Sequence, residues 1–352
     1  MGRVVVIICS LVLSSSALHA PAARADDEEA PASSDGINRL VEAVQGGSSF
    51  KVRATAAVAL GRLGDPRVVP VLAEVVRADD SYAVRAAAAA ALGRLNNVSG
   101  IAPLLEALHD EDEYVRNEVN DALDRFHSAP HLFAFREALR SDDAVIRLAA
   151  VRAYGDVMRD PDASAGIAAF VIDALGDDDE AVAGAAETAI SAVAHERAIP
   201  LLVGGLSNPA AGVRGACARL IEKRADPRAV PALIAIIVNT DEPEDVRRPA
   251  RAALKRHLEY VDVGRFSADA ANPAHPERLT SLRVIAAVGD QRAVPLVESF
   301  LKDADPTVRI AGARAAVDFG GPKVRGYVEQ ASARETDPRQ KRNLDNLLRW
   351  MR

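Results

Sequence analysis

The side chains of this chain that could carry chemistry are few: seven histidines, two cysteines and several clusters of acids. His127 and His131 have the i, i+4 spacing that places two metal ligands on one face of a helix. Pro130 lies between them, however, and favours a loop. His109 precedes the acidic run 110–113. We interpret all three as solvated histidines in turns rather than as metal ligands.

Two acidic turns, GDDDE at 176–180 and DEPED at 241–245, offer the carboxylate oxygens that Ca²⁺ prefers. Neither contains the EF-hand pattern of acids, glycine and terminal glutamate, so helix capping is the favoured interpretation and calcium binding stays open. The sequence also has no GxSxG, CxxC, HExxH or phosphate-binding glycine loop. We therefore predict no catalytic, cofactor-binding or metal-binding residue and no enzyme activity.

The elements that position these residues are copies of one unit. FKVRATAAVALGRLGDPRVVPVL at 50–72 and YAVRAAAAAALGRLNNVSGIAPLLE at 82–106 align on the arginine of their VR pair. The same pattern returns at intervals of roughly 31 to 36 residues, which is typical of a repeat protein. The aligned arginine, called the anchor below, is Arg53, Arg85, Arg116, Arg147, Arg214, Arg247, Arg278 and Arg309, with Ala183 in one slot and Arg342 as a weaker last member.

Each unit is predicted to be a pair of helices. Apolar residues one before, seven after and ten after the anchor fall on one stripe of a helix. Glycine and proline then end that helix and start another, as in Gly64-Asp65-Pro66. The residue three after the anchor is small in almost every unit; Cys217 occupies this column and is interpreted as a buried, inert thiol. Because such a pair buries its apolar faces only against neighbouring copies, the predicted fold class is an all-α solenoid.

The anchor arginine lies in the first turn of its helix, where the macrodipole disfavours a positive charge. Acids that precede it are candidates to compensate. We expect some of them to cap the helix, most clearly Asp305 before Pro306. Others are expected to reach the arginine of the next repeat and to form a structural ladder along the stack. The candidate acids are Asp79, Asp80, Asp112, Asp143, Asp179, Asp245 and Asp305.

The motif VRxxAAxALGxLGDPRxVPxL at 52–72, with related stretches at 84, 213, 277 and 308, resembles the HEAT-repeat family, in particular the short bacterial repeats of phycobilisome-lyase-like proteins. The resemblance covers residues 37–350. It implies a right-handed superhelix of about nine to ten helical hairpins, with the second helices on the concave face and an Asp–Arg ladder between repeats. It implies no reaction, because such arrays host many functions. Ala183 and the segment 259–276 depart from the pattern, and we expect distortion at both.

Two enzyme classes resemble this family. Deoxyhypusine hydroxylases hold iron with several His-Glu pairs, whereas this chain has one, His195-Glu196, so no iron site is predicted. Bilin lyases act on chromophores of cytoplasmic antenna proteins, and the export signal described below argues against that activity. A bilin-lyase-like or other enzyme-associated role stays an alternative.

The exposed columns of the second helix are expected one, four, five and eight residues after the anchor. They are small in the first two repeats, polar and acidic in the third, and basic or apolar in the late repeats. An apolar patch rimmed by arginine is typical of a protein interface; the alternative is that helix tilt buries its apolar members. The predicted partner-binding residues are Asn117, Asn120, Asp121, Asp124, Arg248, Arg251, Leu279, Leu282, Arg283, Ile310 and Arg314.

The first 25 residues have the features of a signal peptide. Residues 1–3 supply one positive charge, residues 4–13 an apolar stretch, and Ala23-Arg24-Ala25 a cleavage site. Residues 26–36 then form an acidic, flexible leader, and residues 37–352 the solenoid. Residues 340–352 are expected to cap its apolar end or, alternatively, to dock on another chain. No later apolar run is long enough to span a bilayer.

Charge and cysteine content narrow the partner and the compartment. The formal net charge is −7 and becomes −9 when Arg3 and Arg24 leave with the signal, so nucleic acid is not expected as a partner. Cys217 would then be the last cysteine, which rules out an intrachain disulfide. We predict an exported protein, periplasmic or extracellular, that acts as a scaffold or adaptor for another protein without a cofactor. A structural envelope spacer is the remaining alternative.

Overall fold

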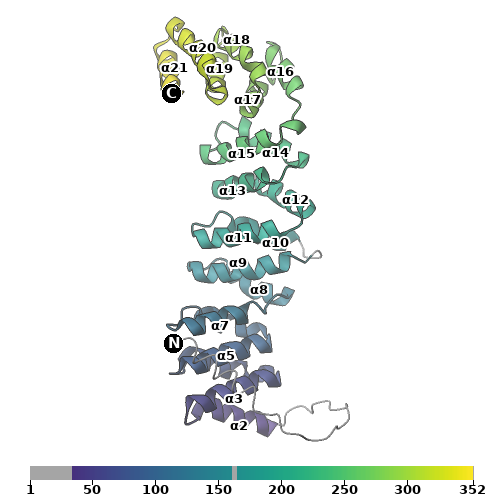
Figure 1. Cartoon of the computed structure of the whole chain (residues 1–352), viewed down its shortest axis with the longest axis vertical. Helices are drawn as coiled ribbons and strands as arrows, with labels where there is room; N and C mark the ends of the chain where they lie inside the picture. Colours follow the sequence, from purple (N-terminus) through teal and green to yellow (C-terminus); the bar gives the residue numbers. More distant parts are fainter. Residues whose placement is uncertain (1–33, 161–164, 352) are drawn as a thin grey trace.

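The computed structural model of the chain describes residues 34–160 and 165–351. The predicted signal peptide and most of the predicted leader lie outside this part. All regular structure in the described residues is helical, and Figure 1 shows the helices stacked in one elongated column. This confirms the predicted all-α solenoid. In the described ranges, none of the helices combines the length and the apolar character that crossing a membrane requires.

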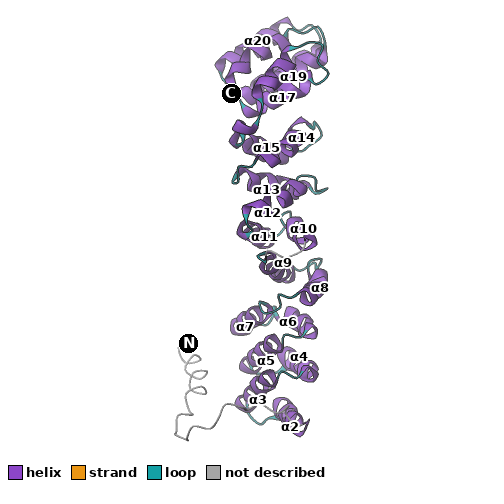
Figure 2. Ribbon diagram, turned by 90° about the vertical axis from the view of Figure 1, so that its right-hand side faces the viewer, coloured by secondary structure: helices purple, strands orange, loops and turns teal. Residues whose placement is uncertain are grey.

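The helices alternate between two rows, which Figure 2 shows side by side from α2 to α11. Each hairpin contributes a first helix to one row and a second helix, which carries the anchor, to the other. The first helices are α2 (Ser34–Gly46), α4 (Val69–Ala78), α6 (Ile101–Ala107), α8 (Ala129–Ala138), α10 (Ala165–Ala174), α12 (His195–Gly205), α14 (Val230–Val238), α16 (Val263–Ala271), α18 (Val294–Leu301) and α20 (Pro322–Arg334). The second helices are α3 (Phe50–Leu63), α5 (Tyr82–Leu95), α7 (Glu113–Leu123), α9 (Ala144–Met158), α11 (Glu180–Ala192), α13 (Ala211–Glu222), α15 (Glu244–Arg256), α17 (Arg278–Val288), α19 (Pro306–Phe319) and α21 (Pro338–Trp350).

The turn from a second helix to the following first helix is built as the sequence predicts. Gly64 ends α3 with a φ of 70°, in the left-handed region that favours glycine. The Asp65 side chain then accepts a hydrogen bond from the N–H of Arg67 at 2.9 Å, and Pro66 begins a short 3-10 helix. The 3-10 helices of the described residues are η1 (Pro66–Val68), η2 (Val98–Gly100), η3 (Pro227–Ala229), η4 (Leu258–Tyr260) and η5 (Gln291–Ala293).

One continuous apolar core runs through the column between the two rows. It contains the predicted stripe and also the predicted small column, in which Ala88 and Cys217 are fully buried. Burial raises the pKa of the Cys217 thiol to about 12. The thiol therefore stays protonated at neutral pH, as expected of an inert packing residue.

Consecutive second helices do not pack equally closely, and we call each such contact a joint. Close contact is made at α3/α5, α5/α7, α9/α11, α13/α15 and α17/α19, the closed joints. The second helices touch little at α7/α9, α11/α13 and α15/α17, which we call the open joints. At two of these a first helix makes contact instead: α10 contacts α13, and α14 contacts α17. The last joint, α19/α21, lies between these extremes. Two open joints fall where distortion was expected, after Ala183 and beside the segment 259–276.

Closed joints bury residues that were expected to be exposed. A Cβ atom added to Gly93 would lie 2.7 Å from the Cα of Ala122, and one added to Gly61 would lie 2.8 Å from the Cα of Ala91. Ala89, four residues after its anchor, is also fully buried. The prediction that these columns face outward is wrong at closed joints, because successive second helices approach almost to backbone contact.

Candidate functional site

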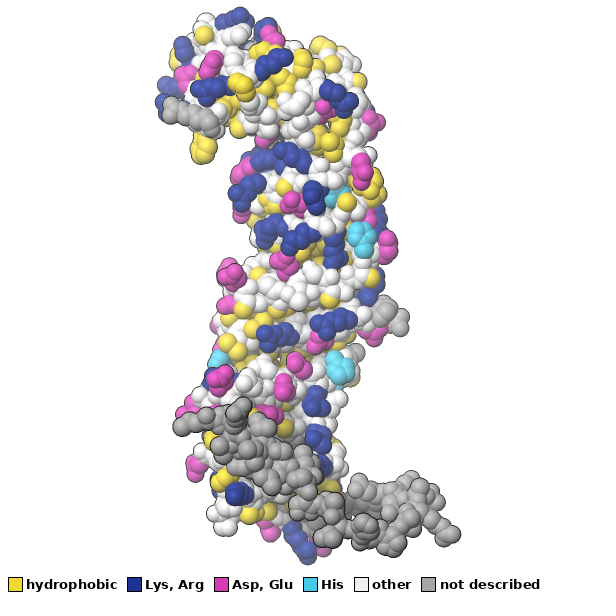
Figure 3. Space-filling view, viewed as in Figure 1, with side chains coloured by type: hydrophobic (Ala, Val, Ile, Leu, Met, Phe, Trp, Pro, Cys, Tyr) yellow, Lys and Arg dark blue, Asp and Glu magenta, His cyan; other side chains and the backbone are white. Residues whose placement is uncertain are grey.

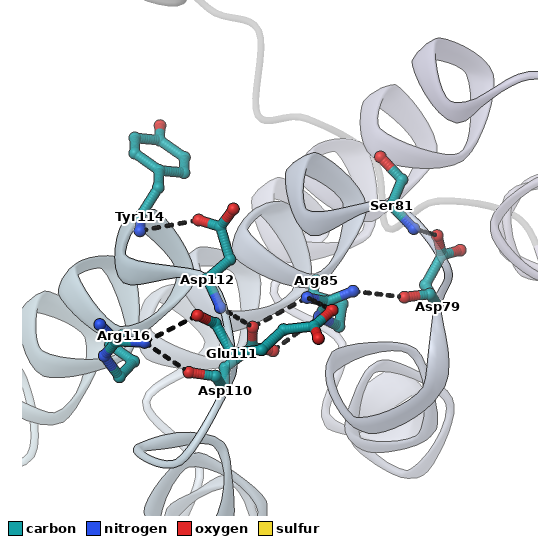
Figure 4. A network of polar contacts seen from close by, with 8 residues as sticks. All are labelled: Asp79, Ser81, Arg85, Asp110, Glu111, Asp112, Tyr114 and Arg116. Atoms are coloured by element: carbon teal, nitrogen blue, oxygen red, sulfur yellow. Dashed lines mark hydrogen bonds and ion pairs between the residues drawn. The ribbon is translucent and has the colours of Figure 1, made fainter. Parts of the chain in front are cut away.

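The closed joint between α5 and α7 contains a buried ion pair (Figure 4). Arg85 donates from Nε and Nη2 to the two carboxylate oxygens of Asp110 at 2.6 and 2.8 Å. Its Nη1 donates to the backbone oxygen of Asp79 at 2.9 Å. The two paired side chains are 9% and 8% exposed. Since Asp110 also accepts from the N–H of Asp112 at 2.9 Å, one acid both shapes a turn and joins two repeats.

Pairing between an anchor and an acid recurs along the stack at six anchors, as the ladder prediction expects, through one or two hydrogen bonds. The direction differs from the prediction, because each acid pairs with the anchor of the preceding repeat. Of the candidate acids only Asp79 is a member; Asp112, Asp143, Asp179 and Asp305 cap second helices. The ladder pairs are Arg53–Asp79, Arg85–Asp110, Arg147–Asp177, Arg214–Glu242, Arg278–Asp303 and Arg309–Glu335, with nitrogen–oxygen distances of 2.6 to 3.0 Å.

Two of the ladder acids, Asp110 and Asp177, are held in their charged form. The hydrogen bonds from Arg147 keep the pKa of Asp177 below its usual value. Burial works to raise the pKa of Asp110, but the hydrogen bonds from Arg85 and from the Asp112 N–H outweigh it and lower that pKa. These carboxylates are therefore ionised throughout the neutral range, and the pairs are full salt bridges.

The open joints are the places where the ladder is interrupted. At α7/α9 the sequence position of the ladder acid holds Ser141, and Arg116 Nη1 donates to the backbone oxygens of Asp110 and Glu111. No carboxylate of the described ranges forms an ion pair with it. At α11/α13 the anchor slot holds Ala183. At α15/α17 Arg247 has no acid across the joint among the described residues, and its Nη2 lies 3.2 Å from Glu244 of its own helix.

Sequence reasoning missed the column that distinguishes the two kinds of joint. Six residues before the next anchor stand Asp79, Asp110, Asp177 and Asp303 at closed joints, and Ser141, Asn208 and Asn272 at open joints. The Ser and Asn side chains make the same turn contact with the N–H two residues later, but they cannot neutralise an arginine. At α13/α15 the ladder acid, Glu242, stands five residues before the next anchor, Arg247. An acid five or six residues before the next anchor is therefore the sequence signal that distinguishes a closed joint from an open one.

An acidic patch, consisting of Asn117, Asn120, Asp121 and Asp124 on α7, borders the open joint α7/α9. Asn117, Asp121 and Asp124 are exposed, whereas the Asn120 side chain donates to the backbone oxygen of Arg116 at 2.8 Å. Burial, followed by repulsion from Asp156 on α9, raises the pKa of Asp124. The joint therefore gathers carboxylates that lie outside the ladder, although Arg152 works to lower the pKa of Asp124 and Arg159 pairs with Asp156 at 3.0 Å.

An arginine cluster, consisting of Arg247, Arg251, Lys255, Arg283 and Arg314, surrounds the open joint α15/α17. Figure 3 shows Lys and Arg side chains gathered on this face over α13 and α15, up to the junction with α17. Two carboxylates lie among them: Glu244, which bonds Arg251, and Asp318 of α19, which lies 3.7 Å from Arg251. Arg248, predicted to bind a partner, is exposed on the same helix.

The apolar residues predicted for the same interface are largely packed inside. Leu282 is fully buried, so its predicted role at the surface is wrong. Leu279 is half-buried against the core. Ile310 is half-buried and lines a small hollow that it shares with Leu344 and Leu347 of α21. The late repeats therefore present charge, not an apolar patch, on this face.

The histidines take part in local contacts. His109 lies 2.6 Å from Asp143, and His195 Nε2 lies 3.0 Å from Asp226. His131 is buried, bonded to Ser128 Oγ at 2.9 Å and to the backbone oxygen of Asn96 at 3.2 Å; the prediction of a solvated turn residue is wrong for it, because it packs under the start of α8. Within the described ranges no three His, Cys, Asp or Glu side chains gather as metal ligands would.

A family model of HEAT repeats matches the sequence. The model of HEAT repeats matches residues 37–124, 168–255 and 268–346, well over half of the chain. The first two matches end with α7 and α15, at open joints. Comparison with curated proteins gave no match.

Several solved structures have a similar chain path. They include importin beta (15% identity, TM-score 0.40, covering 90% of this chain and 51% of that one) and human deoxyhypusine hydroxylase in complex with glycerol (17% identity, TM-score 0.29, covering 81% and 96%). An engineered protein is similar at 18% identity with a TM-score of 0.30, covering 90% of this chain and 98% of that one.

Proposed function

The chain belongs to the HEAT-repeat family, and from this premise we propose that it is an exported adaptor, periplasmic or extracellular, that binds another protein along its second-helix row. The observation that carries the proposal is the distribution of charge on that row. The acidic patch on α7 and the arginine cluster at α15/α17 have opposite signs and lie four hairpins apart along the stack. Opposite patches at a fixed separation orient an approaching partner and fix its register.

The mechanism is presentation of a long surface. Apolar residues hold the hairpins together, and the charged side chains that remain outside decide which partner fits. Affinity then comes from a few arginine contacts. Specificity comes from repulsion of a partner that places its acidic side chains against the acidic patch or its basic side chains against the arginine cluster. No catalytic step is part of this function.

Site-specific photocrosslinking in the native host tests the binding proposal. A photoreactive residue is placed at Asn117 or at Arg248, on the second-helix row, and at Ala102 or Ala235, exposed residues of the first-helix row. A discrete crosslinked protein from the first two positions, and none from the control positions, is the expected result. Equal labelling of all four, or none from any, would replace the adaptor with a structural spacer.

Export is tested on the same material. The full-length gene is expressed in the native host, and the N-terminus of the protein is determined by mass spectrometry. The proposal expects the mature chain to start at Asp26 and to fractionate outside the cytoplasm. A cytoplasmic chain that keeps residues 1–25 would contradict export while leaving the binding surface intact.

A further inference from the structure

The arginine cluster concentrates positive charge in an acidic protein. Its five cationic side chains face two carboxylates, Glu244 and Asp318, which leaves a local net charge of +3. The whole chain, by contrast, has a formal net charge of −7. Uncompensated like charges destabilise the free protein, so their arrangement on one surface points to a ligand of opposite sign.

The interrupted ladder explains why the charge is uncompensated. Arg247 lies where other anchors meet an acid across the joint, but the column position opposite it holds Asn272. Its Nε atom is buried without a hydrogen-bond partner in the described part of the chain. A buried guanidinium N–H without an acceptor is costly, and the part of the Arg247 side chain that is exposed, 30% of it, can still pair with a carboxylate supplied from outside.

Arg283 of α17 lies across the open joint from the members of the cluster on α15. It is half-buried, and its Nη1 donates to the backbone oxygen of Val238 at the end of α14, at 2.9 Å. Burial, followed by repulsion from Arg314 and Arg247, lowers the pKa of Arg283. Arg314 itself is exposed, and none of the described carboxylates forms an ion pair with it. The cluster therefore spans α15, α17 and α19, and its hydrogen bond to Val238 holds Arg283 in place.

We infer that the arginine cluster binds an acidic segment of the partner protein, with several Asp or Glu side chains close together; this inference rests on the proposed adaptor function. Arginine forks pair with carboxylates through two hydrogen bonds, as the ladder of this same chain does at Arg85 and Asp110. A partner carboxylate at α15/α17 extends that pattern across the open joint. The ladder shows that arginines at these joints pair with carboxylates, so we favour an acidic protein segment, and binding of a phosphate polymer is an outcome of the test below.

Binding of a short fluorescein-labelled polyglutamate peptide, followed by fluorescence anisotropy, tests the inference. The variant Arg247→Gln/Arg314→Gln removes two charges of the cluster. The control Arg62→Gln/Arg94→Gln removes two exposed charges from α3 and α5. We expect saturable binding that weakens with rising salt, a loss of affinity of about tenfold or more in the cluster variant, and little change in the control.

Circular dichroism melting identifies a variant that fails to fold, in which case the exposed Arg314→Gln is tested alone and is expected to show a smaller loss in the same direction. The inference is wrong if both pairs of substitutions weaken binding equally or if polyglutamate does not saturate. It is also wrong if inorganic polyphosphate binds the cluster and polyglutamate does not.

Competition separates this inference from the adaptor function. Polyglutamate is added before irradiation to the chain that carries the photoreactive residue at Arg248, while its complex with the partner is still non-covalent. Displacement of the partner supports the acidic segment. Persistence of the partner contradicts it and leaves the adaptor in place, whereas a chain that crosslinks no partner contradicts the adaptor even if polyglutamate binds.

Discussion

The joints α5/α7 and α7/α9 are neighbours with similar helices but different construction. At the first, Arg85 and Asp110 form a buried ion pair and Gly93 allows close helix contact. At the second, Ser141 replaces the acid and Asp124 stands where Gly93 stands one repeat earlier. The closed joint is neutralised internally and has little charge left for a partner. The open joint leaves its charged side chains without partners across the joint, so the repeats proposed to bind are those that stack least tightly.

Removal of a ladder acid from a closed joint should have the largest effect. Asp110→Ala leaves the buried Arg85 guanidinium with only the exposed Glu111, 3.6 Å away, as a counter-ion, and the expected loss in free energy of unfolding is about 3 kcal/mol. The control Asp142→Ala removes an exposed acid beside an open joint and should change stability by less than about 0.5 kcal/mol. Urea unfolding measures both changes in the free energy of unfolding. Similar losses for the two variants would mean that the ladder pair stabilises the fold no more than an exposed acid does.

A bulky side chain in a closed joint should cost somewhat less. Gly93→Leu places its Cβ against Ala122 and should destabilise by about 2 kcal/mol, because the helices must separate. The matched change Gly184→Leu lies on α11 at an open joint with no atom within 4 Å of the added Cβ. It should be neutral or stabilising by up to about 1 kcal/mol through helix propensity. Thermal unfolding measures the stability of the two variants. Equal losses for Gly93→Leu and Gly184→Leu would contradict the difference in helix packing between the closed and the open joint.

Acid should weaken the closed joints selectively. The pKa of Asp110 is lower in the folded chain than in the unfolded chain, so its stabilising effect is complete above the unfolded pKa and is lost as pH falls through the folded one. The stability difference between the natural chain and Asp110→Asn should be constant near neutrality and shrink below about pH 5. A difference that does not depend on pH would show that charge is not its cause.

Closing an open joint should give the smallest effect. Ser141→Asp offers Arg116 the carboxylate that it lacks, and the expected gain is about 0.5 to 1 kcal/mol because the site is partly exposed. The same substitution in an Arg116→Met background separates the ion pair from the turn. If the gain persists without the arginine, the new acid acts only as a turn residue.

Local features of the fold were predictable because they depend on neighbours in the sequence. The hairpins follow from the apolar stripe and from turns such as that at Gly64, where glycine and Asp65 set the chain direction. The existence of a ladder was predictable, because the anchor arginine lies at the helix end where the macrodipole disfavours a positive charge. Its members were not, since Asp110 and Asp112 stand two residues apart and only the contact between repeats decides which one pairs and which one caps.

The candidate site was predicted less well, because it depends on how closely helices approach. Leu282 has the sequence position of an exposed residue, yet contact between repeats buries it. Arg283 lies half-buried at the open joint α15/α17, and Arg314 of α19 is exposed. The column six residues before the anchor, with Ser141 and Asn272 in place of acids, would have indicated where that happens.

The central claim is that the ladder pair determines whether a joint is tight. Distances between paired spin labels measure this directly, with labels at Arg62 and Arg94 across the closed joint α3/α5 and at Arg125 and Asp156 across the open joint α7/α9; these positions are equivalent in their repeats. We predict a narrow distance distribution for the first pair, a broader one for the second, and narrowing of the second by Ser141→Asp. Equal widths across both joints, unchanged by that substitution, would contradict the claim.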